Sequence, residues 1–122
     1  DYNYIKKAEN YILSLNNSVE TIWFGPKIEP GIDPKKILHN GCQNELKLKK
    51  NIKNNYVNLD NFIKKLSSNK NYDYISQIDA LNFNNKKDLF NCSEIFWRDN
   101  VHFSEAGLKR FSNRILNSLN LN

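Results

Sequence analysis

Apolar side chains recur at helical spacing in three parts of the chain. The first part runs from Tyr4 to Leu15, the second covers residues 45–66, and the third follows Ser104. Apolar positions three or four residues apart are typical of an amphipathic helix that buries one face. We expect three such helices, whose buried positions are Tyr4, Ile5, Ala8, Tyr11, Ile12 and Leu15, then Ile52, Tyr56, Leu59, Ile63 and Leu66, and finally Leu108, Phe111, Ile115 and Leu119.

Polar residues indicate where these helices begin, break and meet solvent. Ser104 is expected to cap the third helix at its N-terminus, and Asp60 and Lys64 have the spacing of a favourable i,i+4 pair. Asn54 and Asn55 predict an interruption of the second helix. The faces expected to be exposed carry Lys6, Lys7, Glu9 and Asn10 in the first helix and Lys109, Arg110 and Arg114 in the third.

Two short segments have the composition of β-strands. Val19–Phe24 is rich in β-branched and aromatic residues, and residues 72–78 form the second candidate, with Tyr72, Tyr74 and Ile75 expected to be buried. Residues 27–43 hold two prolines and two glycines, so we expect a loop there with one helical turn near residues 34–38.

The order of these elements is helix, strand, loop, helix, strand, loop, helix. Such alternation favours an α/β structure in which the strands at 19–24 and 72–78 are parallel neighbours or near-neighbours, with helices on the faces of the sheet. Two strands cannot cover three helices, so we expect further strands from a part of the protein before Asp1. Residues 1–122 are therefore predicted to be a single domain that is the C-terminal portion of a larger one.

Length and composition agree with this interpretation. The chain has 122 residues, lacks methionine and begins directly inside the first predicted helix. We therefore expect a piece of a longer protein. No apolar run approaches the ~20 residues of a membrane-spanning helix, and no stretch has the order of a secretory signal peptide.

The charge of the chain is positive but dispersed. The formal net charge is +5, and the lysines are scattered rather than gathered in one stripe beside exposed aromatic residues. A stripe of that kind is what a nucleic-acid-binding surface needs. A basic nucleic-acid-binding domain is therefore the less favoured alternative, and we expect no nucleic acid among the partners.

The two cysteines leave several possibilities open. Cys42 and Cys92 lie fifty positions apart and form no C-x-x-C motif. Together with His39 and His102 they would make two histidine and two cysteine ligands, but this spacing does not fit a zinc knuckle. We therefore expect no metal. A disulfide, if the domain is extracytoplasmic, and two unrelated buried thiols remain alternatives.

The best candidate for chemistry is an aspartate three residues before a histidine. Asp99 and His102 share one short loop that leads from a strand region into the third helix. At this spacing the carboxylate can accept a hydrogen bond from the imidazole Nδ1–H, fix the tautomer and stabilise the imidazolium. Nε2 would then face outward as a general base. A histidine in a purely structural role near a helix start is the alternative.

Neighbouring residues have a functional and a structural interpretation. Trp97 would line the substrate pocket or belong to the core, and Arg98 would contact an anionic group of the substrate or be a surface charge. His39 would touch substrate or be a solvated loop residue. Gly107, in the first turn of the third helix, suggests close packing of that helix on the sheet.

These residues resemble a known family. The pattern D-x-x-H-x-S-x-x-G over residues 99–107 is similar to the last conserved block of the SGNH (GDSL-like) hydrolases. The strand that ends at Gly25–Pro26, and the segment from Tyr74 through Asp79 to Leu81, look like the corresponding strands in order. The chain is most similar to SGNH domains fused behind integral-membrane acyltransferase domains, which O-acetylate cell-surface sugars.

The resemblance implies a function and also shows a departure. It implies the C-terminal part of a three-layer α/β/α sandwich with a parallel sheet, and the Asp99–His102 part of a serine triad. No serine of the chain follows a Gly-Asp, and the oxyanion-hole residues of the family are not recognisable. We expect the nucleophile in the missing N-terminal part and no esterase activity from the 122 residues alone. A degenerate domain that never had these residues is the alternative.

The resemblance therefore predicts a serine esterase or O-acyltransferase domain that acts on acyl esters, above all acetyl esters, of carbohydrate. Its partners would be an acyl donor, a carbohydrate acceptor and the upstream part of the same protein, including a membrane acyltransferase domain. It implies no cofactor and an extracytoplasmic location at the bacterial cell surface. A non-catalytic SGNH-like carbohydrate-binding or scaffold domain is the alternative from a different class.

Overall fold

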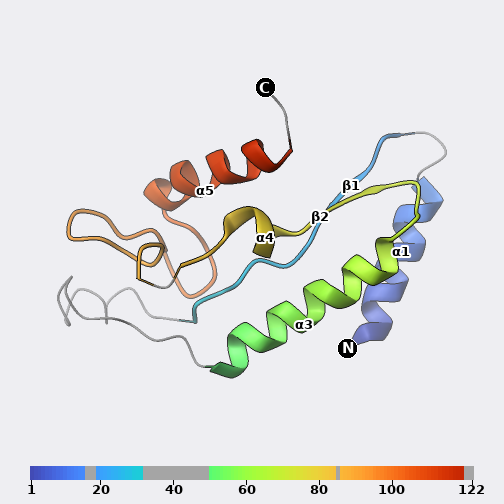
Figure 1. The fold of residues 1–122 in the computed structure, drawn as a ribbon, viewed down its shortest axis with the longest axis horizontal. Coiled ribbons are helices and arrows are strands. Elements are labelled where there is room, and N and C mark those ends of the chain that lie inside the picture. Colours follow the sequence, from blue (N-terminus) through green and yellow to red (C-terminus); the bar gives the residue numbers. More distant parts are fainter. Residues whose placement is uncertain (16–18, 32–49, 85, 120–122) are drawn as a thin grey trace.

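A computed structural model describes residues 1–15, 19–31, 50–84 and 86–119 (Figure 1). The predicted turn near residues 34–38 lies outside these ranges. In chain order the described elements are α1 (Tyr2–Leu15), β1 (Ile22–Phe24), α3 (Lys50–Ser67), β2 (Asp73–Ile75), α4 (Gln77–Leu81) and α5 (Glu105–Ser118).

The two strands form a small parallel sheet, as the order of the elements predicts. Trp23 of β1 is paired with Tyr74 of β2, and Ile22 and Phe24 are paired with Asp73 and Ile75. In Figure 1, α1 and α3 lie on one side of the two strands and α5 lies on the other. The fold is therefore mixed α/β. Within the described residues, no helix combines the length and the apolar character that crossing a membrane requires.

The second strand is shorter than its composition predicts. It ends at Ile75, and Ser76 caps α4 by accepting a hydrogen bond from the Asp79 backbone N–H at 3.1 Å. The serine stops the strand because its side-chain oxygen satisfies a free N–H of the first helical turn. Tyr72 is buried, as expected, but Tyr74 and Ile75 are only half-buried.

Helix α3 is continuous, so the predicted interruption at Asn54 and Asn55 is wrong. Both asparagines are exposed, and the buried stripe passes them on the other face of the helix. The expected pair of Asp60 and Lys64 is present at 2.8 Å between Oδ2 and Nζ. Packing of the apolar face decides helix formation here over the weak propensity of two asparagines.

Helix α1 is rotated relative to the expected orientation. Tyr4 and Tyr11, predicted to be buried, are 70% and 65% exposed, whereas Glu9, predicted to be exposed, is 5% exposed. The Tyr72 hydroxyl donates a hydrogen bond to Glu9 Oε1 at 3.2 Å, and Lys70 Nζ lies 3.8 Å from the same oxygen. These partners allow a carboxylate to be buried, because the Tyr72 hydroxyl satisfies part of its hydrogen-bonding capacity and the Lys70 ammonium compensates its charge.

The main core lies beneath α5. Phe111 of this helix is buried as predicted, but Leu108, expected on the same face, is 58% exposed. A Cβ on Gly107 would lie 1.9 Å from the Phe96 carbonyl oxygen, so α5 packs closely on the loop that carries Phe96 rather than on the sheet. The buried side chains of this core are Leu81, Leu89, Phe90, Phe96, Trp97 and Phe111.

Candidate active site

The loop between Trp97 and Phe103 is closed by an antiparallel bridge between these two residues. The Arg98 N–H donates to the His102 carbonyl at 2.9 Å, and the Trp97 and Phe103 ring centroids lie 4.6 Å apart in the core. Ser104 then begins α5, and its Oγ accepts from the Gly107 N–H at 3.1 Å, which confirms the predicted cap. Both ends of the loop are therefore fixed by the core and by the helix.

Within this loop the backbone positions the Asp99 carboxylate. Its Oδ1 accepts hydrogen bonds from the N–H of Val101 at 2.9 Å and from the N–H of His102 at 2.8 Å. These two backbone hydrogen bonds, and after them the His102 side chain, hold the pKa of Asp99 well below its usual range, although partial desolvation opposes this shift. Asp99 is thus a carboxylate throughout the neutral pH range.

The His102 ring lies directly against this carboxylate. Its Nδ1 is 2.9 Å from each of the two Asp99 oxygens. The His102 side chain is 61% exposed, so the ring is accessible from solvent. Because Asp99 engages Nδ1, Nε2 is the ring nitrogen that remains for a second partner. The loop brings the two predicted catalytic side chains into contact, while their catalytic role stays a prediction.

The structure places the two predicted substrate-contacting neighbours differently. Trp97 is 2% exposed and its Nε1 donates to the Asp88 carbonyl at 3.0 Å, so its ring belongs to the core. Arg98 is 69% exposed, and its Nε lies 3.5 Å from Asp99 Oδ2. Arg98 is thus at the site, beside the dyad, whereas Trp97 packs in the core at the start of the loop.

Ser104 follows His102 closely, but its hydroxyl serves the backbone. Its Oγ donates to the Ile95 carbonyl at 2.5 Å and accepts from the Gly107 N–H. A hydroxyl engaged in this way holds the start of α5 and is not placed as a nucleophile for His102. The expectation that the nucleophile lies elsewhere remains a prediction.

A second ionic cluster, which the sequence does not reveal, lies under α5. Asp88 is fully buried, and Arg110 and Arg114, both expected to point outward, turn inward to it instead. Arg114 binds both Asp88 oxygens at 2.8 Å, Arg110 Nε donates to Oδ1 at 2.9 Å, and the Asn84 N–H donates to Oδ2 at 2.8 Å. The sequence contains no signal that pairs Asp88 with Arg110 and Arg114, because these residues lie 22 and 26 positions later in the chain.

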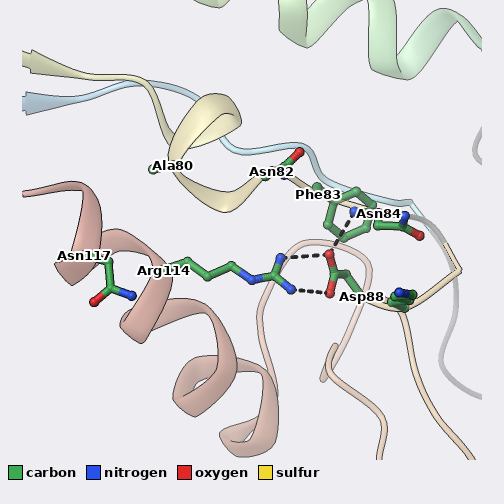
Figure 2. A pocket seen from close by; sticks show the side chains of 8 residues that line it. Ala80, Asn82, Phe83, Asn84, Asp88, Arg114 and Asn117 are labelled. Atoms are coloured by element: carbon green, nitrogen blue, oxygen red, sulfur yellow. Dashed lines mark hydrogen bonds and ion pairs between the residues drawn. The ribbon is translucent and has the colours of Figure 1, made fainter.

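This cluster borders an open cavity of about 500 Å³. Figure 2 shows Arg114 extending from α5 to Asp88, with Asn117 on the same helix and Asn82 across the cavity. The side chain of Arg114 is largely engaged, because it also donates to the Leu81 carbonyl at 2.6 Å. The cavity is lined by Ala80, Asn82, Phe83, Asn84, Lys87, Asp88, Arg114 and Asn117.

Of the histidine and cysteine residues considered as metal ligands, the structure describes Cys92 and His102. His39 and Cys42 lie outside the described residues. Among the residues that are described, no group of three or more histidine, cysteine, aspartate or glutamate side chains is placed to hold a metal ion. Cys92 is exposed and disulfide-bonded, so it is not a buried free thiol.

No family model, no curated protein and no solved structure matches this chain.

Proposed function

We propose that this chain is part of an SGNH-type serine esterase or O-acyltransferase domain, to which it contributes Asp99 and His102. The supporting observation is the geometry of the pair, in which His102 Nδ1 lies 2.9 Å from both oxygens of a carboxylate that the backbone holds in place. Under this proposal the two-stranded sheet is the C-terminal part of a larger three-layer α/β/α sandwich. The serine and the oxyanion donors come from a segment outside these 122 residues.

The proposed reaction uses His102 as the proton carrier. Nε2 accepts the proton of the serine hydroxyl as the serine oxygen attacks the acyl carbonyl, and it then gives this proton to the leaving alcohol. In the second half, a hydroxyl from water or from a sugar loses its proton to Nε2 and attacks the acyl group. The bond between the acyl carbon and the serine oxygen then breaks, and the serine oxygen takes the proton back from Nε2, which restores the free enzyme. Asp99 stays ionised throughout and stabilises the imidazolium that forms in each half of the cycle.

The substrate class and location belong to the same proposal. The resemblance of residues 99–107 to the SGNH block supports acetyl esters of cell-surface carbohydrate as substrates, with no cofactor. The disulfide of Cys92 supports an extracytoplasmic location, because disulfides persist in oxidising compartments. The partners are an acyl donor, a carbohydrate acceptor and the upstream part of the protein, with a membrane acyltransferase domain as one form of it.

The test is turnover of a chromogenic acetate, and acetyl transfer to a sugar, by the protein that includes the residues encoded before Asp1. His102→Ala should lower the rate by about 10⁶-fold, the scale of loss seen when the histidine of a Ser-His-Asp triad is removed. Asp99→Asn should lower it by about 10⁴-fold, by analogy with the Ser-His-Asp template. Lys53→Ala, at an exposed position of α3, serves as the matched control and should leave the rate unchanged.

The 122-residue chain alone should have no activity in the same assay. A folded His102→Ala protein that retains the rate of the parent would contradict the role of His102 as general base. If that variant also binds carbohydrate as well as the parent does, the non-catalytic binding domain becomes the better interpretation.

A further inference from the structure

The segment that follows β1 binds the loop of the Asp99–His102 pair at two adjacent points. Lys27 Nζ donates a hydrogen bond to the Val101 carbonyl at 2.5 Å, and the Gly31 N–H donates to the Asn100 carbonyl at 3.2 Å. These contacts join residues more than sixty positions apart in the sequence. In Figure 1 the chain after β1 runs toward the loop that precedes α5.

The two carbonyls belong to the same peptide units that hold the carboxylate. The Val101 carbonyl and the His102 N–H are the two ends of one planar peptide unit, and the Asn100 carbonyl and the Val101 N–H are the ends of the unit before it. Both N–H groups donate to Asp99 Oδ1. Each peptide unit is therefore bound on one side by the segment after β1 and binds the Asp99 carboxylate on the other.

Lys27 is itself held in place. Its Nζ lies 5.4 Å from the centroids of both the Trp97 and the Phe103 ring, within the range of a cation–π contact. Glu29 Oε1 is 3.5 Å from the same nitrogen. The Lys27 side chain is only 23% exposed, so the ammonium is partly desolvated and its hydrogen bond to Val101 is correspondingly stronger.

Helix α3 completes this arrangement through Glu29. The Tyr56 hydroxyl of α3 donates to Glu29 Oε2 at 2.8 Å. Burial, and after it the hydrogen bond and the negative charge of Glu29, raise the pKa of Tyr56 to about 12. Tyr56 is therefore a protonated donor at any working pH, and it fixes the carboxylate that faces Lys27.

We propose that Lys27 is a positioning residue for the Asp99–His102 pair, an inference that rests on the proposed function. By holding the Val101 carbonyl, Lys27 fixes the orientation of the peptide unit whose N–H aligns the Asp99 carboxylate. The aligned carboxylate keeps the proton on His102 Nδ1 and leaves the lone pair on Nε2, which is the form a general base requires.

The test measures the tautomer of the neutral His102 ring by ¹⁵N NMR of the 122-residue chain at pH about 9, where imidazoles are neutral. The chain has two histidines, so a His39→Gln background leaves a single ring to observe. The parent should carry the proton mainly on Nδ1. Lys27→Met, which keeps the length and apolar contacts of the stem, should shift the ratio toward the Nε2–H form about fivefold, the factor that corresponds to one weakened hydrogen bond.

Two further variants give the scale of this effect. Asp99→Asn gives the tautomer ratio expected when the Nδ1–H preference is lost completely. Lys27→Arg, which keeps a cationic donor, should have the tautomer ratio of the parent. Lys53→Met is the matched control for loss of an exposed lysine and should leave the tautomer unchanged. In the active protein, Lys27→Met should lower kcat about tenfold with KM unchanged, because misplacement of the pair affects the chemical step rather than binding.

The outcomes separate the two proposals. If Asp99→Asn leaves the tautomer unchanged, the dyad and the proposed function fail together. If Asp99→Asn shifts it and a folded Lys27→Met does not, only the role of Lys27 is rejected. Lys27→Gln provides a second variant if Lys27→Met does not fold, and loss of the folded spectrum in both would show that Lys27 is a stability determinant and would overturn the positioning role.

Discussion

Asp88 and Asp99 lie in the same aromatic-rich segment, and each carboxylate accepts backbone and side-chain hydrogen bonds in a different setting. Asp88 is fully buried, and its cationic partners Arg110 and Arg114 come from α5. The Asp99 side chain is 46% exposed, and its hydrogen-bond donors come from residues at most three positions away. The first carboxylate joins distant parts of the chain, whereas the second organises only its own loop.

The difference determines what each carboxylate can do. Burial opposes the charge on Asp88, but Arg114, the Asn84 N–H and Arg110 outweigh this effect and lower its pKa. A charge in that position is costly unless every partner is present, so the cluster stabilises one arrangement of α5 and the segment before it. Asp99 is held by the backbone of its own loop and remains open to solvent, where its carboxylate orients the exposed His102 ring.

The largest expected effect is the loss of the buried charge. Asp88→Asn should lower the free energy of unfolding by about 3 kcal/mol or more, because two arginines are then left without their counterion in a partly buried position. Urea unfolding followed by circular dichroism measures it. Asp73→Asn, at an exposed position of β2, is the control and should change the stability little. A loss for Asp88→Asn as small as that of the control would show that the buried ion pairs of Asp88 do not stabilise the fold.

The stabilisation by Asp88 should also depend on pH. The pKa of Asp88 is lowered in the folded state, so its stabilising contribution is complete above the ordinary aspartate range near pH 4 and is lost as the pH falls through the lowered value. The difference in unfolding free energy between the parent and Asp88→Asn should therefore be constant at neutral pH and narrow below about pH 4. A difference that instead widens in acid would contradict the assigned direction.

The smallest expected effect on stability is that of the exposed carboxylate. Asp99→Asn should leave the urea midpoint close to that of the parent, because an exposed ion pair contributes little to folding. The same variant should lose the Nδ1–H preference of His102 and, in the active protein, most of the rate. If Asp99→Asn destabilises the chain as much as Asp88→Asn does, Asp99 is a structural residue of the loop, and the functional interpretation of the dyad would have to be abandoned.

The parts of the fold that depend on local order were predictable from the sequence. Helical spacing identifies α3 and α5, and the order of elements predicts the parallel pairing of β1 and β2. The contact between Asp99 and His102 was also predictable, because two side chains three residues apart in one tight loop lie close together. The cap at Ser104 follows in the same way from adjacent residues.

Which polar side chains turn inward depends on contacts between distant parts of the chain, and these contacts exist only in the folded protein. Periodicity alone places Glu9, Arg110 and Arg114 on solvent faces, yet each is drawn to a partner from another part of the chain. Lys27 shows the same effect at the candidate site, where its acceptor is 74 residues away. The physical reason is that a buried polar group must be hydrogen-bonded, and the position of its partner depends on how the elements pack together rather than on the spacing of residues along one element.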